Sequence, residues 1–242
     1  MLVTERKLPL SGGTEKRSYV RAIFTQIAPR YDLLNHVLSL NMDRRWRRQA
    51  VAELGWERAP AGRYLDLCSG TLDLAATLGT RGGFTGQVIG ADFVLPMLEL
   101  GRKKSDRVRP VNADALDLPF PDVSFDGATV GFGVRNLADL DRGLAEAARV
   151  IKPGGRFVIL EFTTPSWQPM RGAYLLYFRQ ILPFIGRLVS RHADAYTYLP
   201  ESVLSFPEPA QLAARMAGQG FSAVRWQLLL GGICAIHVGT RR

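Results

Sequence analysis

The sequence predicts an α/β fold: a Rossmann-like, seven-stranded sheet flanked by helices. From Arg63 onward short apolar runs alternate with helical stretches, which is typical of parallel strands joined by crossover helices. Acidic residues stand at the ends of several of these runs, where parallel sheets bind their ligands. The last two runs are separated by little more than Gly231 and Gly232, a link so short that it requires an antiparallel hairpin.

Each element follows from its own pattern. Residues 1–16 are expected to form a tail and residues 17–60 a helical cover. From Val20 to Ile27 apolar residues recur with helical spacing, Pro29 should end or kink that helix, and a second helix is expected at 42–54. Strands are expected at residues 63–67, 87–92, 109–114, 125–133, 156–162, 221–230 and 232–240. Helices are expected at residues 73–79, 95–104, 137–151 and 207–219. The first five strands should be parallel.

The chain is expected to be a single domain, 1–242, with an insertion at 163–207. That insertion is rich in Leu, Ile, Phe and Tyr with arginines spaced along it, most densely around Tyr174–Val189. It is either a core helix with charged edges, or a groove for an apolar ligand, or a membrane-surface contact.

Composition limits the class of protein. The chain has 242 residues, of which 47% are hydrophobic and 22% charged, as in ordinary globular proteins. Two cysteines make no disulfide framework and suit a reducing compartment. Neither the two cysteines nor the three histidines lie near other metal-ligating residues in the sequence, so no metal is expected. Without a signal-peptide pattern or an apolar run long enough to span a bilayer, we expect a cytoplasmic protein.

The formal net charge is +9, and the first 50 residues hold ten Lys and Arg against four Asp and Glu. The densest patch is DRRWRRQ at 43–49. It is either a solvated helix face or a site of attraction to anionic lipid or nucleic acid, and charge alone does not choose between them. Because no RNA-binding module and no aromatic platform accompany the patch, no nucleic-acid partner is expected.

Four strand ends carry candidate ligand-binding groups. Asp66 ends the first strand ahead of a turn containing Gly70. Asp92 ends the second strand, Asp114 with Ala115 the third, and Gly131 the fourth. Such aspartates also serve as helix caps, and that alternative stays open.

The chemistry of these groups favours an adenosine cofactor without phosphates. A carboxylate at Asp92 suits a ribose diol, and a carboxylate at Asp114 suits an adenine amine. Neither G-x-G-x-x-G nor G-K-[ST] is present, so a dinucleotide or a phosphate-cradling loop is not indicated. S-adenosylmethionine is the cofactor that fits.

From about Val20 to Thr240 the chain resembles the ubiquinone and menaquinone biosynthesis C-methyltransferases, which have the class I S-adenosylmethionine-dependent fold. The resemblance is carried by FTQIAPRYDLLNHVLSLNMDRRWRR, LDLCSGT, GADFVLPML, YTYLPESVLSFP and GGICAIHVG, and most specifically by GFGVRN followed by RVIKPGGR. It implies cofactor contacts at Thr71, Asp92, Asp114 and Ala115. Asp66, Gly70 and Gly131 are expected to line the same pocket.

One position departs from the family pattern, which has glycine where this chain has Leu72. Leucine disfavours a positive φ. If the residue already lies in the helix that follows, leucine suits it and only narrows the pocket wall. If backbone must approach the cofactor there, affinity falls. We expect tolerance, because the other strand-end residues are intact.

The resemblance implies methyl transfer to a ring carbon of a prenylated hydroquinone in respiratory quinone biosynthesis. Arg135 and Asn136, after the fourth strand, are expected at the reacting groups, with Arg135 stabilising a phenolate oxygen. Alternatively, Arg135 pairs with an acid such as Asp139 and Asn136 caps the next helix.

The prenyl tail would occupy the insertion, and the basic N-terminal region would contact an anionic membrane at its inner face. A naphthoquinol or benzoquinol acceptor, another small phenolic acceptor, a non-catalytic binding protein and a homodimer all stay open.

Overall fold

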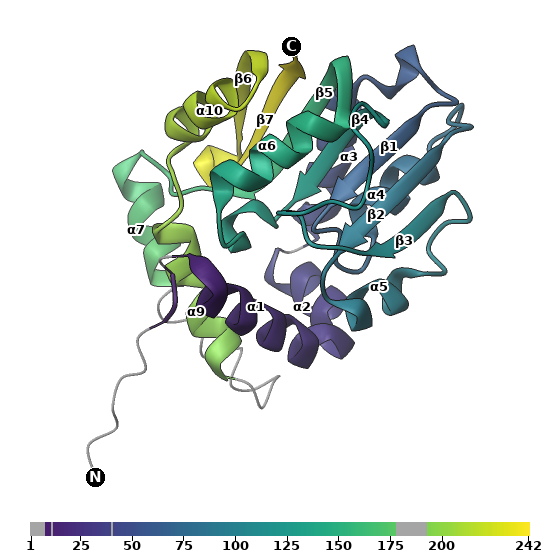
Figure 1. Cartoon of the computed structure of the whole chain (residues 1–242). Coiled ribbons are helices and arrows are strands. Elements are labelled where there is room, and N and C mark those ends of the chain that lie inside the picture. The colour runs from purple at the N-terminus through teal and green to yellow at the C-terminus, as the bar shows by residue number, and fades with distance from the viewer. Residues whose placement is uncertain (1–7, 11, 40, 178–192) are drawn as a thin grey trace.

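A mixed sheet forms the centre of the computed structural model, which describes residues 8–10, 12–39, 41–177 and 193–242 (Figure 1). In this part of the chain the seven strands are β1 Arg63–Leu67, β2 Gln87–Asp92, β3 Val108–Asn112, β4 Phe125–Gly131, β5 Ile151–Phe162, β6 Phe221–Leu229 and β7 Cys234–Arg241. Their order is β3-β2-β1-β4-β5-β7-β6. The first five are parallel and β7 runs antiparallel to both β5 and β6, so the predicted topology is confirmed.

Helices cover both faces of the sheet. On one face lie α3 (Met42–Leu54), α4 (Asp73–Gly79) and α5 (Leu95–Gly101), and on the other α6 (Leu140–Val150) and α10 (Pro209–Gly218). One core joins Trp46, Val51 and Leu78 to Val88 and Val158. The core on the opposite face is built around Phe125, Phe157 and Phe221, with Leu144 and Met216 from the helices. Alternate residues of each strand thus pack on opposite faces, as the pleat requires.

The N-terminal helices lie across one end of the sheet, beside α9 (Ala193–Leu204) and close to α7 (Gln168–Leu176) (Figure 1). They are α1 (Gly13–Ile27) and α2 (Tyr31–Leu38), joined by the 3-10 turn η1 (Ala28–Arg30) that contains Pro29. Proline therefore ends α1 as expected. Helix α3 begins and ends where the sequence predicts it, but it packs on the sheet and not over its end.

The expected tail is wrong at its boundary, because α1 begins at Gly13, within residues 1–16. Lys16 is buried and donates a hydrogen bond to the carbonyl oxygen of Arg135, and the Gly13 N–H donates to the carbonyl oxygen of Ala138. These contacts join segments more than 110 residues apart, so local pattern did not reveal them. The first two strands lie where they were expected, whereas β3 ends at Asn112, before Asp114.

The expected insertion is described in part. Helices α7 and α9 belong to it, whereas residues 178–192, which include most of the Tyr174–Val189 stretch, lie outside the described residues. Remaining short turns are η2 (Trp56–Arg58), η3 (Val134–Asn136) and η5 (Leu230–Gly232). Within the described residues no helix combines the length and the apolarity needed to cross a bilayer.

Candidate active site

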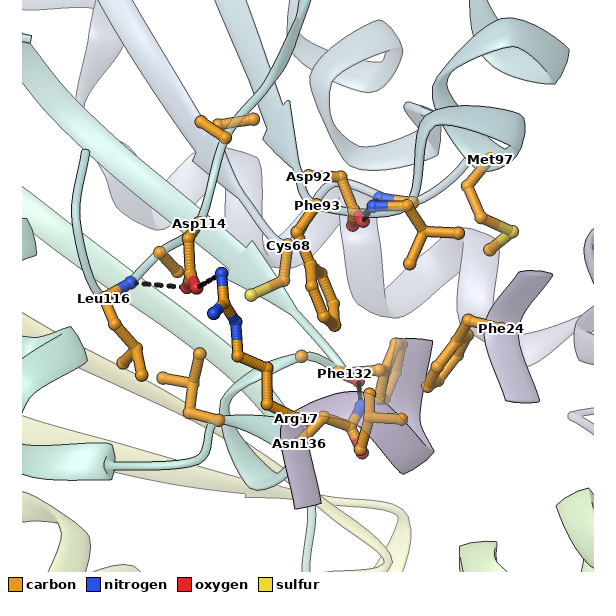
Figure 2. Close-up of a pocket in the computed structure, with 18 of the residues that line it drawn as sticks. Arg17, Phe24, Cys68, Asp92, Phe93, Met97, Asp114, Leu116, Phe132 and Asn136 are labelled. Carbon is orange, nitrogen blue, oxygen red and sulfur yellow. Dashed lines mark hydrogen bonds and ion pairs between the residues drawn. The ribbon is translucent and has the colours of Figure 1, made fainter. Parts of the chain in front are cut away.

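Two neighbouring cavities open beneath α1 and α2 at the carboxyl ends of the parallel strands. The first is lined by the loop after β1, the end of β2, the segment after β3 and the end of β4 (Figure 2). Among the predicted residues, it gathers Gly70, Asp92, Asp114, Ala115, Gly131 and Asn136. Sequence reasoning therefore located this cavity, because the ends of parallel strands meet at one edge.

Asp92 is held rigidly at the edge of the first cavity. Its Oδ2 accepts a hydrogen bond from the Gly70 N–H and its Oδ1 from the Val94 N–H, both at 2.8 Å. Burial raises the pKa of this carboxyl, while the backbone donors act in the opposite direction. A carboxylate has about four acceptor sites, so the N–H groups of Gly70, Phe93 and Val94 leave acceptor capacity for a hydroxyl group.

Gly70 has φ of 52°, a conformation that glycine adopts without strain, and this bends the loop so that its N–H reaches Asp92.

Asp114 lies on another wall of the first cavity and faces the cover. Its Oδ1 accepts from the Leu116 N–H at 2.9 Å, and its Oδ2 pairs with the guanidinium of Arg17 on α1 at 2.7 Å (Figure 2). An amine that binds Asp114 would share the carboxylate with Arg17. No local pattern in the sequence predicts the role of Arg17, because the pair links two segments nearly one hundred positions apart.

Two predicted residues support the cavity without lining it. Asp66 is fully buried; its Oδ1 accepts from the Thr129 hydroxyl at 2.7 Å, and its Oδ2 accepts from the Ala75 N–H in the first turn of α4. The alternative role as a helix cap is therefore what Asp66 performs. Burial raises the pKa of Asp66 to about 7. The Thr71 hydroxyl donates to Asp32 of α2, which ties the loop to the cover.

The expectation that Leu72 lies in the helix is wrong, whereas the effect of this residue on cofactor affinity stays a prediction. Leu72 has φ of 65° and precedes α4, so it is not helical, and its side chain is fully buried in the core beneath the loop. Room for it comes from Gly90 of β2, where an added Cβ would stand 2.3 Å from the Leu72 Cδ2. The side chain does not narrow the first cavity, whose lining does not include it.

The second cavity adjoins the first and is mostly aromatic and aliphatic. The two share the side chains of Phe24, Tyr31 and Phe132. The remaining lining comes from α1, α2 and the turn after it, α3, η3, β5 and α9, namely Ile23, Ile27, Asn35, Ser39, Asp43, Trp46, Arg47, Arg135, Phe162, Tyr198 and Leu199. Flat rings dominate: Phe132 lies 4.5 Å from Phe162 and 6.3 Å from Trp46 between ring centroids. Sequence reasoning missed this cavity, and its only signal was the apolar face of the cover helices.

Tyr31 stands between the two cavities. Its hydroxyl interacts with Asn35 and lies within electrostatic range of both Arg47 and Arg135, while burial raises its pKa. The two arginines therefore flank a single aromatic space.

Arg135 lines the second cavity and not the first. It is buried and pairs with Glu161 of β5 at 2.7 Å, and its guanidinium also donates to the carbonyl oxygen of Phe132 at 2.6 Å. Burial alone would lower the pKa of Arg135, but Glu161 raises it, so the group stays charged. The alternative expectation that Arg135 pairs with an acid is confirmed, although the acid is Glu161 and not the suggested Asp139.

Asn136 reaches the first cavity from the same turn. Its Oδ1 accepts from the Tyr198 hydroxyl at 3.1 Å, and its amide donates to the Phe132 carbonyl oxygen. The cap of α6 is Asp139, whose side chain accepts from the Arg142 N–H, so Asn136 does not cap that helix. Arg135 and Asn136 thus place one polar side chain in each cavity.

Comparison with known proteins gives a consistent assignment. A family model described as the ubiE/COQ5 methyltransferase family matches residues 13–241. A demethylmenaquinone methyltransferase of Thermus thermophilus is 52% identical over 90% of this chain and its own full length. One of Deinococcus radiodurans is 47% identical over the full length of both chains. A ubiquinone/menaquinone biosynthesis C-methyltransferase of a Geobacter species is 45% identical, covering 94% of this chain and 98% of its own.

Solved structures agree on the fold. A Thermotoga maritima S-adenosylmethionine-dependent methyltransferase superposes with a TM-score of 0.66 at 22% identity, covering 92% of this chain and all of its own. The [4+2]-cyclase SpnF superposes with a TM-score of 0.68 at 17% identity, covering 96% and 98%. Because one scaffold carries such different chemistry, the fold alone does not assign the reaction.

Proposed function

Because the chain belongs to the ubiE/COQ5 methyltransferase family, we propose that it transfers a methyl group from S-adenosylmethionine to a ring carbon of a prenylated hydroquinone. The acceptor is demethylmenaquinol or the corresponding benzoquinol, and the reaction belongs to respiratory quinone biosynthesis. The names of the relatives support this acceptor class.

The residues of the first cavity suit the methyl donor. Two oxygens of Asp92, fixed by backbone N–H groups, offer acceptor capacity for a ribose hydroxyl. Asp114 offers an acceptor for the adenine amine, with the backbone of Ala115 beside it, and Gly70 and Gly131 let the chain approach closely. The donor supplies a methyl group bonded to a positively charged sulfur. These residues bind and orient it.

The observation that carries the proposal is the wall that the two cavities share. Phe24, Tyr31 and Phe132 line both, so a group held in one adjoins a ring held in the other. Bringing two reactants into such proximity contributes several kcal/mol, and up to about 7–11 in the best cases. The flat rings of Phe132, Phe162 and Trp46 offer stacking faces to an aromatic acceptor.

Arg135 is proposed to act on the acceptor through its charge. A phenolic hydroxyl has a pKa near 10, and its anion makes the ring far more nucleophilic. A guanidinium is a poor base because it stays protonated, so its role is to stabilise the developing phenolate. The Glu161 pair orients it toward the second cavity. Asn136, tied to Tyr198, orients groups in the first cavity.

The prenyl tail and the membrane surface are also given places on the molecule by this proposal. The prenyl tail enters the insertion along α9, because Tyr198 and Leu199 of α9 line the second cavity beside Phe162, the residue before the insertion. The exposed arginines Arg44 and Arg48 of α3 contact an anionic membrane surface. A homodimer stays a prediction.

The experiment is to incubate the purified protein with S-adenosylmethionine and reduced demethylmenaquinol or demethylated benzoquinol, and to follow the products by mass spectrometry. The expected result is a gain of one methyl group on one acceptor class. Transfer only to non-prenylated phenols, or to no acceptor, would contradict the proposal. For the membrane contact, liposomes with anionic lipid should retain the protein at low salt and release it at high salt.

A further inference from the structure

The polar side chains of the second cavity fall into two groups. Arg135 and Tyr198 belong to one, supplied by η3 and α9. The other comes from α2, the turn after it and α3, and consists of Asn35, Ser39, Asp43 and Arg47. A 1,4-hydroquinone also has two polar ends, one hydroxyl on each side of a flat ring. The first group contains the permanently charged guanidinium of Arg135. The second group combines the Asp43–Arg47 ion pair with the hydrogen-bonding side chains of Asn35 and Ser39.

The second group contains a continuous set of hydrogen bonds. The Ser39 hydroxyl donates to Asp43 Oδ1 at 2.8 Å, and His36 Nδ1 lies 2.9 Å from Asp43 Oδ2. Ser39 and Asp43 line the aromatic cavity, whereas His36 lines an open depression on the other side of α3. The three side chains therefore connect the closed cavity with the outer surface.

The reaction needs such a connection. When a positively charged methyl group replaces a ring hydrogen, one proton is released for each turnover. A cavity walled by Phe24, Trp46, Phe132 and Phe162 offers few acceptors for it. Arg135 does not accept a proton, because Glu161 holds it charged.

We propose, on the basis of the proposed function, that Ser39, Asp43 and His36 form the route by which the proton of one acceptor hydroxyl leaves the second cavity. The phenolic O–H bond breaks and its electron pair stays on oxygen. The phenolic proton forms a new O–H bond at the Ser39 Oγ, while the original Ser39 proton passes to Asp43 Oδ1. The protonated carboxyl of Asp43 turns its O–H toward His36, which in its Nε2–H tautomer accepts the proton at Nδ1 and releases the Nε2 proton to water in the outer depression. After the methyl group is transferred, the ring hydrogen leaves its carbon as a proton and restores the phenolic O–H bond, so one proton in total leaves the site per turnover.

The charges around Asp43 favour the passage of a proton through its carboxylate over retention of the proton there. Burial would raise the pKa of Asp43, but Arg47, the Ser39 hydroxyl and His36 together hold it below its usual value. Arg47 pairs with Asp43 on one side and lies 3.5 Å from Asp73 of α4 on the other. Asp43 is therefore a carboxylate that does not retain a proton passed to it.

The outer depression favours release. Its lining beside His36 is strongly basic, with Arg44, Arg47, Arg48 and Arg81 against the single acid Asp73. His36 lines this depression, so a proton that reaches its ring has a direct path to solvent. On the cavity side, the other ionisable groups in the lining are Tyr31, Arg135 and Tyr198. Arg135 and the relay thus act on the acceptor in complementary ways, one by charge and one by proton removal.

The test compares acceptors of different acidity. Single-turnover rates are measured for the native protein, Ser39→Ala and His36→Gln with reduced 1,4-naphthalenediols that carry zero, one or two halogens on the non-reacting ring. If the relay removes the proton, each variant loses on the order of 100-fold in rate with the least acidic diol. The loss should shrink with the more acidic diols, and most at high pH, because a larger fraction of the acceptor is then ionised without the relay.

Controls separate this result from a structural effect. Thr77→Ala removes a hydroxyl that lines the outer depression and bonds only within α4, and it should leave every rate unchanged. Calorimetry should show unaltered S-adenosylmethionine binding in both relay variants. Asp43→Asn is avoided, because it would leave Arg47 buried without its partner.

An equal rate loss for all acceptors, or no loss with any, overturns the relay. If the native protein methylates no quinol at all, the proposed function itself fails, and this outcome is recognised before the variants are compared.

Discussion

The Lys16 ammonium group lies 2.9 Å from the carbonyl oxygen of Arg135 and donates a hydrogen bond to it. This bond joins α1, the first helix of the chain, to the turn that carries the two proposed acceptor-site residues. Burial lowers the pKa of Lys16, with the charge of Arg135 as a second cause. The cover is therefore part of the active site and not merely packed over it.

Replacing Lys16 by Met should affect turnover more than stability. The change leaves the Arg135 carbonyl oxygen without its donor, a cost of about 1–3 kcal/mol, but removes the cost of burying an ammonium group. We expect the free energy of unfolding to fall by less than about 2 kcal/mol and kcat to fall about 10-fold. Urea denaturation and steady-state kinetics measure both. Arg21→Gln, on the exposed side of α1, is the matched control and should change neither.

Asp92→Asn should weaken binding of the methyl donor with little effect on the fold. The amide provides fewer acceptor sites than the carboxylate and brings donors that face the Gly70 and Val94 N–H groups. A loss of about 2–3 kcal/mol, or roughly 30- to 150-fold in Kd, follows from losing hydrogen bonds to a charged group. Isothermal titration calorimetry with S-adenosylmethionine checks this. Glu99→Gln on the exposed face of α5 is the control, and an unchanged Kd in Asp92→Asn would contradict the ribose assignment.

Asp66 should make stability depend on pH. Its folded pKa of about 7 lies above its value in the unfolded chain, so the folded state binds the proton more tightly. Its contribution is fully present below pH 4 and is lost as the pH rises to about 7, up to about 4 kcal/mol in all. Asp66→Asn cannot titrate there.

Urea denaturation between pH 4.5 and 8 tests this prediction. The native protein should lose stability relative to Asp66→Asn as the pH rises, and parallel curves would show that Asp66 is ionised throughout.

Arg135 is best tested together with its partner. Arg135→Met alone leaves the buried Glu161 without its partner, which lowers the free energy of unfolding by about 3–5 kcal/mol. A loss of activity in that variant could therefore come from misfolding and not from catalysis. The double variant Arg135→Met/Glu161→Gln removes both charges and should fold. We expect turnover to fall by two to three orders of magnitude with unchanged donor affinity, because Arg135 lines only the acceptor cavity. Near-normal turnover in the double variant would exclude Arg135 from the reaction.

The fold was largely predictable because its signals are local. The strands β1 and β2 and the helix α3 lie where the spacing of apolar residues predicts them. At the ends of each element the spacing of apolar residues changes, and this change marks its bounds. The first cavity was predictable for a related reason. The ends of parallel strands bring Asp92 and Asp114 to one edge of the sheet, whatever conformations their side chains adopt.

The second cavity was not predictable in the same way. Phe24, Trp46, Phe162 and Tyr198 come from four segments spread over most of the chain, and each is also an ordinary core residue. Only their packing distinguishes a cavity wall from a filled core. Arg135 was found through the family resemblance, but its partner Glu161 lies inside an apolar strand and carried no signal of its own.

Leu72 and Gly90 should show strong coupling in stability. Leu72 holds a left-handed conformation that costs a leucine about 1–2 kcal/mol, yet its side chain is fully buried. Leu72→Gly removes the strain and also the packing, which is worth about 2–5 kcal/mol, so the variant should be less stable by roughly 1–3 kcal/mol. Gly90→Ala should also destabilise the native chain, because its methyl group would overlap the Leu72 Cδ2.

In the double variant that clash is absent, so Gly90→Ala should cost little once Leu72 is Gly. A double-mutant cycle by urea denaturation measures the coupling, and additive costs would refute it. Donor affinity supplies the decisive comparison. Since the Leu72 side chain lies in the core and outside the first cavity, the Kd for S-adenosylmethionine should change less than about 3-fold in Leu72→Gly. A much tighter Kd in the glycine variant would mean that leucine at this position restricts the cofactor loop after all.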